Sequence, residues 1–207
     1  MTKLENFSYF SKRHFIKKSN SFFDYFTTVQ TLNREIYLNV ITPQIAEEIN
    51  KTIRFWNFID VENGTEMTKR PPIKIFIDSM GGDFNAMLSI IDSIKLSLTP
   101  VYTINIGTTY KEAFYIYLAG HKRYSYPNAT FVYKRDLQQL DEIDKQANLY
   151  SSYYERQLSN LKDFILEKTK ITENEYNKHL KSPWWISAED AKNLRICNTI
   201  IANHKIF

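Results

Sequence analysis

The sequence predicts a layered α/β fold with a parallel sheet, because short apolar strands alternate with helical segments along the chain. Two strand–turn–helix units follow one another. Residues 73–77 lead into a helix over 84–98, and residues 101–106 lead into a helix over 110–119. A glycine-containing turn separates the strand from the helix in each unit. This repeated order favours parallel strands joined by right-handed crossovers.

The segment before the first unit is expected to contain an arm, a strand and a helix. Residues 1–33 show no clean periodicity, and we expect an N-terminal arm with aromatic anchors ahead of one domain over 34–207. Residues 34–40 alternate as a short strand does. Thr42 and Pro43 then open a helix, with the threonine as its N-cap. Its apolar face is predicted to contain Ile45, Ile49, Ile53 and Trp56.

The remaining elements follow from local signals. The polar residues 60–72 predict a surface loop, and residues 124–133 predict another strand around a Pro-Asn pair. From Leu137 to residue 165 apolar side chains recur every three or four positions, which predicts an amphipathic helix of about eight turns. A helix of this length exceeds a small domain, so we expect part of it to project and pack against a partner subunit. Shorter helices are predicted from Thr172 to about Leu180 and after the N-cap Ser187.

Composition excludes several classes of protein. The chain has 207 residues, of which 43% are hydrophobic and 24% charged, which is typical of one soluble globular domain and not of a disordered chain. A net charge of +4 gives no support for nucleic-acid binding, and the basic cluster at 12–18 is expected to be a solvated arm. The single cysteine, Cys197, excludes an internal disulfide and is predicted to be a small buried core residue.

Targeting signals and cofactor sites are also not expected. The first 26 residues contain Glu5 and Asp24 and no continuous apolar stretch, so we predict neither a secretory signal nor a membrane span. The expected location is the cytoplasm or an organellar stroma or matrix, with a plastid included. The four histidines show no metal-ligand spacing, so no metal or other cofactor is expected.

Four segments occur together in one order: 73–82 (IKIFIDSMGG), 106–120 (IGTTYKEAFYIYLAG), 123–128 (RYSYPN) and 187–192 (SAEDAK). With the long helix between the third and the fourth, they resemble the ClpP family, the proteolytic subunits of the Clp protease. The resemblance covers roughly residues 34–201 and implies a ClpP/crotonase-type fold with a compact head and a long-helix handle at about 134–170. It also implies seven-membered rings stacked through the handles, with other ClpP-like subunits and an AAA+ unfoldase as partners.

The resemblance also locates the family's catalytic triad, and this sequence lacks all three residues. The position of the nucleophilic serine holds Lys111, that of the histidine holds Lys134, and that of the aspartate holds Pro183. A protonated lysine is no nucleophile, a second lysine does not replace imidazole as an acid and base at neutral pH, and proline has no carboxylate. We therefore expect no catalytic residues and no peptidase activity from this chain alone.

The resemblance implies further site positions. Gly82 and Glu112 stand where the family has the two backbone donors of its oxyanion hole, and the Glu112 carboxylate would oppose an oxyanion. Gly81 and Gly82 are expected to allow close approach of a peptide, with Asp83 adding charge to that groove, and they lack the spacing of a phosphate-binding loop. Ion pairing of the two lysines with Glu112, Asp83 or Asp136, and neutral drift of a solvent-filled site, both stay open.

Several other residues allow a functional and a structural interpretation. Thr108 or Thr109 beside a lysine would resemble a hydroxyl–lysine dyad, but capping of the following helix is favoured. His121 is predicted to be an exposed turn residue and not a displaced base. Trp184 and Trp185 are expected to pack locally more than to mark a ligand pocket or subunit contact. The handle tyrosines are assigned either to a ring interface or to handle core: Tyr150, Tyr153 and Tyr154.

The leading interpretation is a non-catalytic ClpP-like subunit, similar to the inactive ClpR-type paralogues of plastids and cyanobacteria, with a structural role in a mixed Clp protease ring. One alternative is a pseudoprotease that assembles with itself as a scaffold or peptide-binding ring. Another is a residual serine-peptidase-like hydrolase with an unconventional site. An acyl-CoA enzyme of the crotonase group is disfavoured, because no segment resembles its adenine-binding segment.

Overall fold

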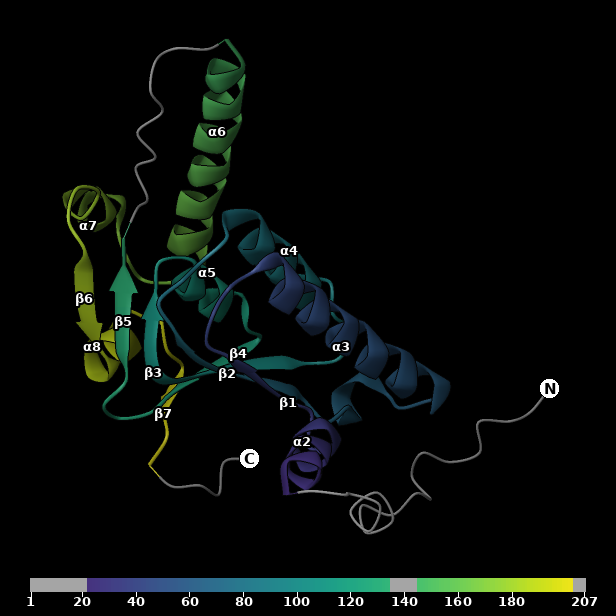
Figure 1. Cartoon of the computed structure of the whole chain (residues 1–207). Helices are drawn as coiled ribbons and strands as arrows, with labels where there is room; N and C mark the ends of the chain where they lie inside the picture. The colour runs from purple at the N-terminus through teal and green to yellow at the C-terminus, as the bar shows by residue number, and fades with distance from the viewer. Residues whose placement is uncertain (1–21, 135–144, 203–207) are drawn as a thin grey trace.

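The computed structural model describes residues 22–134 and 145–202 of the chain (Figure 1). Its centre is one sheet in which the strands run in the order β1-β2-β3-β4-β7, while β5 pairs with the end of β3 and β6 pairs with β5. Every pairing is parallel except that of β5 with β6. The predicted parallel α/β class is therefore confirmed. The strands are β1 (Glu35–Leu38), β2 (Ile73–Ser79), β3 (Val101–Tyr110), β4 (Lys122–Ser125), β5 (Thr130–Tyr133), β6 (Trp184–Ser187) and β7 (Thr199–Ile200).

The helices divide between a layer on the sheet and a projecting element. Helices α3, α4 and α5 lie together beside the sheet, whereas α6 extends away from it (Figure 1). The projecting helix agrees with the expected handle, and residues 135–144 of the predicted handle lie outside the described residues. The helices are α2 (Phe22–Leu32), α3 (Pro43–Glu62), α4 (Phe84–Lys95), α5 (Glu112–Ala119), α6 (Lys145–Lys168), α7 (Glu173–Lys178) and α8 (Ala188–Asn193), with a short 3₁₀ helix at Met67–Lys69.

The main core lies between the sheet and these helices. All eight residues of α5 are buried, as expected for a helix that is enclosed on every side. On α3 the predicted apolar face is buried at Ile49, Ile53 and Trp56, and Ile45 packs against it while only half-buried. Cys197 is buried in the same core, as predicted.

The predicted helix starts are confirmed by their caps. The Thr42 hydroxyl accepts the N–H of Ile45 at 3.2 Å, and Pro43 occupies the first turn of α3. Thr172 and Glu175 form a reciprocal capping box at the start of α7. Ser187 caps α8. These signals are local in the chain, which is why the sequence alone predicts them.

The predicted polar loop at 60–72 is wrong at its beginning, because α3 continues to Glu62. Asp60 points into the protein, where its two carboxylate oxygens accept hydrogen bonds from Arg34 at 2.6 and 2.7 Å. It also accepts the hydroxyl of Thr99 at 2.7 Å. Burial alone would raise the pKa of Asp60, but the hydrogen bonds from Arg34 and Thr99 hold it below its ordinary value. The last turn of the helix is therefore held by a buried ion pair.

The predicted helix over 84–98 ends earlier, at Lys95. The reason is a tertiary contact with α3. The side-chain oxygen of Asn57 accepts the backbone N–H groups of Leu98 and Thr99 at 2.8 and 3.0 Å. These two donors are then not used to extend α4, and the chain turns towards β3.

The predicted turn at Gly107, Thr108 and Thr109 is wrong, because β3 runs on to Tyr110. The first half of β3 pairs with β4, and its last three residues pair with β5. The change of partner keeps the backbone extended, and α5 consequently begins at Glu112 and not at residue 110. The predicted strand over 124–133 is for the same reason two strands, β4 and β5, each paired with a different part of β3.

The N-terminal arm is partly helical. Residues 22–32, which show no clean periodicity in the sequence, form α2 next to the start of β1 (Figure 1). Residues 1–21 of the predicted arm lie outside the described residues. The boundary between an arm and a domain at residue 34 stays a prediction.

Candidate functional site

The fold brings the three positions that the family resemblance assigns to a triad to one edge of the sheet. Lys111 directly follows β3, and its N–H donates to the carbonyl of Val132 on β5 at 3.3 Å. Lys134 directly follows β5. Strand β6 is antiparallel to β5, so its first residue, Trp184, pairs with Tyr133, and Pro183 lies just before it. The positions that the resemblance implies for a triad are thus neighbours, although none of them carries triad chemistry.

Lys111 lies in a strained backbone conformation between the strand and the helix. Its φ of 51° and ψ of −115° are unusual for a residue with a side chain. It is also the N-cap of α5, and its side chain makes no capping hydrogen bond. A strained residue at a sharp strand-to-helix turn is the geometry that presents a nucleophile in hydrolases. Here the same geometry presents an alkylammonium group.

The donor implied for the oxyanion hole is already occupied by a side chain of the protein. The N–H of Gly82 donates to Oε2 of Glu112 at 3.0 Å. Glu112 is only 6% exposed, so this carboxylate is held inside the protein. The sequence predicts that Glu112 brings opposing charge near this position. In the structure the Glu112 carboxylate also occupies the N–H of Gly82, which is the donor that a substrate carbonyl would need in such a site.

The rest of the glycine loop is bonded internally as well. The N–H of Gly81 donates to the hydroxyl of Ser79 at 3.2 Å, and the N–H of Asp83 donates to the carbonyl of Ile41 at 2.8 Å. Residue 82 also forms a parallel bridge with Ile41. The three consecutive N–H groups of residues 81–83 are therefore all satisfied without a peptide. Sequence reasoning missed both residues: the Ser79 hydroxyl is a local signal two positions before Gly81, whereas no local pattern reports the approach of Ile41.

Both glycines are needed for this arrangement. Gly81 has a φ of +94°, and a Cβ there would come within 2.4 Å of the Glu112 carboxylate. A Cβ on Gly82 would lie 2.1 Å from the carbonyl oxygen of Ile41. The carboxylate of Asp83, expected to add charge to a peptide groove, instead accepts the N–H of Ala86 at 2.7 Å and caps α4.

The prediction that Thr108 and Thr109 cap the following helix is wrong, because both belong to β3. Thr109 is fully buried, and its hydroxyl has no hydrogen-bond partner within the ranges that the structure describes. A hydroxyl enclosed in this way is not presented to a substrate. Thr109 is therefore excluded as the hydroxyl of the alternative hydroxyl–lysine dyad. The backbone N–H of Thr108 donates to the Asp78 carboxylate at 2.8 Å.

His121, Trp184 and Trp185 contact neighbouring residues of the protein. His121 is exposed, as predicted, and its Nδ1 accepts the N–H of Val101 at 3.0 Å. Trp184 stacks on His179 with a centroid distance of 4.2 Å, whereas Trp185 is 63% exposed and lies near Tyr110.

The handle tyrosines differ from one another. Tyr154 is buried against Phe84, with ring centroids 4.8 Å apart, and Tyr153 is exposed. The side chain of Tyr150 lies outside the described part of the structure. The handle therefore contributes both a core contact and an exposed aromatic group.

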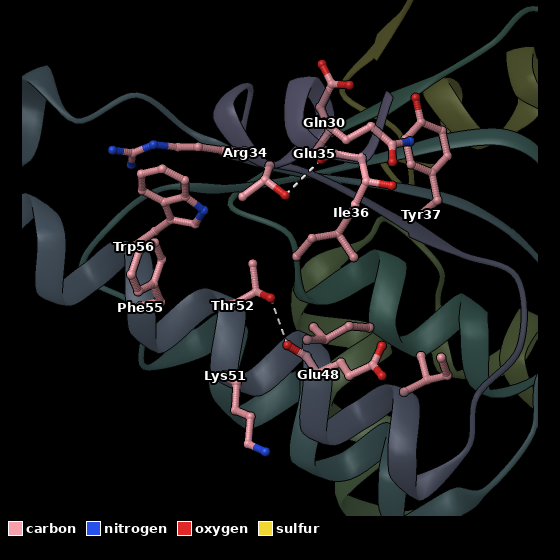
Figure 2. Close-up of a pocket in the computed structure, with 14 residues that line it drawn as sticks. Gln30, Arg34, Glu35, Ile36, Tyr37, Glu48, Lys51, Thr52, Phe55 and Trp56 are labelled. Atoms are coloured by element: carbon pink, nitrogen blue, oxygen red, sulfur yellow. Dashed lines mark hydrogen bonds between the residues drawn. The ribbon is translucent and has the colours of Figure 1, made fainter. Parts of the chain in front are cut away.

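A cavity of about 490 Å³ lies away from the replaced triad, between α2, β1 and α3 (Figure 2). The guanidinium of Arg34 lies over the ring of Trp56 at 4.2 Å along one wall of it. Over residues 22–134 and 145–202, no group of three or more His, Cys, Asp or Glu side chains is arranged to hold a metal ion. No helix in those ranges combines the length and apolar character needed to cross a bilayer.

Comparisons with known proteins agree with this fold. The chain matches the family model of the Clp protease over residues 23–204. It is 27% identical to the ATP-dependent Clp protease proteolytic subunit 2 of Treponema denticola over 171 residues, which are 82% of this chain and 86% of that protein. The protein of the same name from Pseudomonas aeruginosa is 26% identical over 136 residues, 65% of this chain and 68% of that one.

A solved structure shows the same architecture. A ClpP1 point mutant from Listeria monocytogenes superimposes with a TM-score of 0.71 at 26% sequence identity, covering 86% of this chain and 97% of that chain. The predicted ClpP/crotonase-type fold is thereby confirmed. The parallel sheet, the projecting helix α6 and the match to the family model over nearly the whole chain show that this protein belongs to the Clp protease (ClpP) family.

Proposed function

We propose that this chain is a non-catalytic subunit of a mixed Clp protease ring, in which other chains supply the peptidase activity. One observation carries the proposal. At the edge where the triad positions meet stand Lys111, Lys134 and Pro183, and Glu112 takes the backbone donor beside them. Nucleophile, base, orienting carboxylate and oxyanion donor are thus each replaced or occupied.

Membership of a ring is supported by the family and by the handle. Proteins of this family normally assemble into rings that work with Clp ATPases, and α6 projects from the head with a partly exposed aromatic surface at Tyr153. The curated relatives carry the name proteolytic subunit 2, which fits a chain that works beside another proteolytic subunit. The role of this chain would be to complete the wall of the chamber that the stacked rings enclose.

Docking of an AAA+ unfoldase is supported by an aromatic surface on the sheet. On β2 the residues Ile73, Ile75 and Ile77 join the main core, and Phe76 between them joins a separate cluster. Because side chains alternate along a strand, this second cluster lies on the opposite face of the sheet from the main core. Around it pack Tyr37, Tyr102, Ile106, Tyr124 and Tyr126, of which Tyr37 is the most exposed.

The proposed location is the compartment of the partner subunits, either the cytoplasm or an organellar stroma or matrix such as that of a plastid. The proposal is tested by co-expressing this chain with an intact Clp proteolytic subunit from the same genome. Native mass spectrometry should detect rings that contain both chains. A fluorogenic peptide should be cleaved by these rings, because the partner carries the triad.

Two variants separate the roles of the chains. Replacing the nucleophilic serine of the partner by alanine should abolish cleavage, whereas Lys111→Ala in this chain should leave it unchanged. A chain that assembles only with itself, or stays monomeric while the partner assembles without it, would contradict the proposal and favour a self-assembling scaffold. Activity of this chain alone that is lost in Lys111→Ala would instead establish an unconventional hydrolase.

A further inference from the structure

A polar cavity of about 440 Å³ lies at the end of the head where α4, α5 and α6 terminate and β4 begins. Its lining includes no residue of the glycine loop and none of the positions assigned to the triad. Four of its lining side chains are cations, and one is a carboxylate, which leaves an excess of three positive charges. These are Lys95, Arg123, Lys168, Arg195 and Glu167.

Arg123 is the unusual member of this group, because it is only 6% exposed. Its guanidinium donates only to backbone carbonyls: to Ile196 at 2.7 Å, to Arg195 at 2.9 Å and to Lys168 at 3.1 Å. Nη1 has only one long contact, 3.5 Å to the carbonyl of Leu118. Burial lowers the pKa of Arg123, and the positive charge of Arg195 adds to the effect.

Arg34, the other buried arginine in the described part of the structure, has the carboxylate partner that Arg123 lacks. Arg34 forms a two-point ion pair with the Asp60 carboxylate. No carboxylate pairs with Arg123 anywhere in the described ranges. A buried charge without a carboxylate partner is costly, and here backbone carbonyls hold the guanidinium while the positive charge of Arg195 opposes it.

Helix ends explain only part of this cluster. Lys95 and Lys168 stand in the last turns of α4 and α6, where cations are favoured by the helix dipole. Lys168 is also paired with Glu167 at 3.2 Å. Arg123 belongs to a strand, and Arg195 lies in the loop after α8 with a φ of 58°. The helix dipole favours Arg123, whose guanidinium donates to carbonyls at the C-terminal ends of α5 and α6, but it does not account for Arg195.

The ring of His121 completes the lining. Nδ1 of His121 accepts the N–H of Val101, so the neutral ring carries its proton on Nε2. The cavity therefore combines two arginines, two lysines and an imidazole N–H. Arginine presents a planar set of donors that matches the oxygens of a phosphoryl group, and a dianion would offset most of the excess positive charge.

We propose that this cavity binds a small phosphoryl dianion, either free inorganic phosphate or the phosphate of a small phosphomonoester, with Arg195 and Lys168 as its main cationic contacts and the buried charge of Arg123 adding to the positive potential. The site is separate from the proposed role as a non-catalytic ring subunit and does not depend on it. Binding there would tie together the ends of α5 and α6 and the loop after α8 around one anion.

The test uses the purified full chain in its native assembly. Isothermal titration calorimetry with potassium phosphate, and separately with glycerol 3-phosphate, should give saturable binding, and the tighter of the two identifies the preferred source of the phosphoryl group. Phosphate should also raise the thermal midpoint of unfolding above that in potassium chloride at the same pH and ionic strength. Equal effects of phosphate and chloride would overturn the proposal.

The decisive variant is Arg195→Gly. It removes the guanidinium and places glycine at a left-handed position, so the ligand-free protein should be no less stable than the wild type. Its affinity for phosphate should fall at least tenfold. The control is Lys192→Ala, an exposed lysine on α8 outside the cavity, which should leave the affinity unchanged. An unchanged affinity in Arg195→Gly, or an equal loss in Lys192→Ala, would contradict a specific site.

Discussion

The carboxylate of Glu112 accepts the backbone N–H of Gly82 at 3.0 Å, across 30 positions of the chain. Glu112 is the residue after Lys111, so a side chain at the start of α5 holds the glycine loop that follows β2. This contact closes the loop onto the helix from within the protein. It gives Glu112 a structural role in the fold.

Removal of this carboxylate should destabilise the fold. In Glu112→Ala the part-buried hydrogen bond from the N–H of Gly82 to a charged acceptor is lost, which is worth about 1.5–3 kcal/mol. The free energy of unfolding, measured by urea denaturation, should fall by that amount. Glu112→Gln keeps an oxygen acceptor and should lose clearly less. An Ala variant as stable as the wild type would show that the contact does not hold the loop.

The buried pair between Arg34 and Asp60 should contribute strongly to stability. Asp60→Asn leaves a buried guanidinium without its charge partner, and breaking such a pair costs about 3–5 kcal/mol. The matched control is Glu47→Gln, which removes an exposed pair with Lys51 and should leave the unfolding midpoint nearly unchanged. Similar small losses in both variants would contradict the role of the buried pair.

The same pair predicts the pH dependence of stability. The pKa of Asp60 in the folded protein lies below its ordinary value, so the stabilisation is fully present above the unfolded pKa of about 3.9 and is lost as pH falls through the folded pKa. The difference in unfolding free energy between wild type and Asp60→Asn should therefore be constant near neutral pH. It should shrink below about pH 4. A difference that grew on acidification would have the wrong sign for this carboxylate.

Cys197 should be unreactive in the folded protein. Burial raises the pKa of its thiol, which also donates to the carbonyl of Thr199 at 3.2 Å. An aromatic disulfide reagent at pH 8 should label it at least roughly 100-fold more slowly in the native protein than in concentrated guanidinium chloride. Similar rates in the two conditions would show that the thiol is accessible without unfolding.

Arg195 should carry backbone strain. Its φ of 58° is left-handed, which costs a residue with a Cβ about 1 kcal/mol or more. Arg195→Gly should raise the unfolding free energy by up to about 1 kcal/mol in phosphate-free buffer. Arg195→Ala removes the same charge but keeps the Cβ, so it should not gain this stability. Equal stabilities of the Gly and Ala variants would mean that charge, and not strain, governs this position.

Much of the fold could be predicted from local sequence signals. The N-cap Thr42, the buried face of α3 and the strand at 73–77 depend on spacing and on capping chemistry within a few residues, and the structure confirms them. The length of β3 could not be predicted, because its last residues stay extended only through pairing with Thr130, Phe131 and Val132 on another strand. The extra turn of α3 likewise depends on Arg34, 26 positions before Asp60.

By itself, the sequence determined the parallel α/β class. It also places Lys111, Lys134 and Pro183 at the positions that the family resemblance assigns to a triad, and none of these residues has the side-chain group that a Ser-His-Asp triad uses. Only the tertiary structure decided that the N–H groups of residues 81–83 are already bonded, and that Arg123 is buried among carbonyls and cations. The physical reason is that a functional group belongs to its residue, whereas its hydrogen-bond partner and electrostatic surroundings come from segments that meet only when the chain folds.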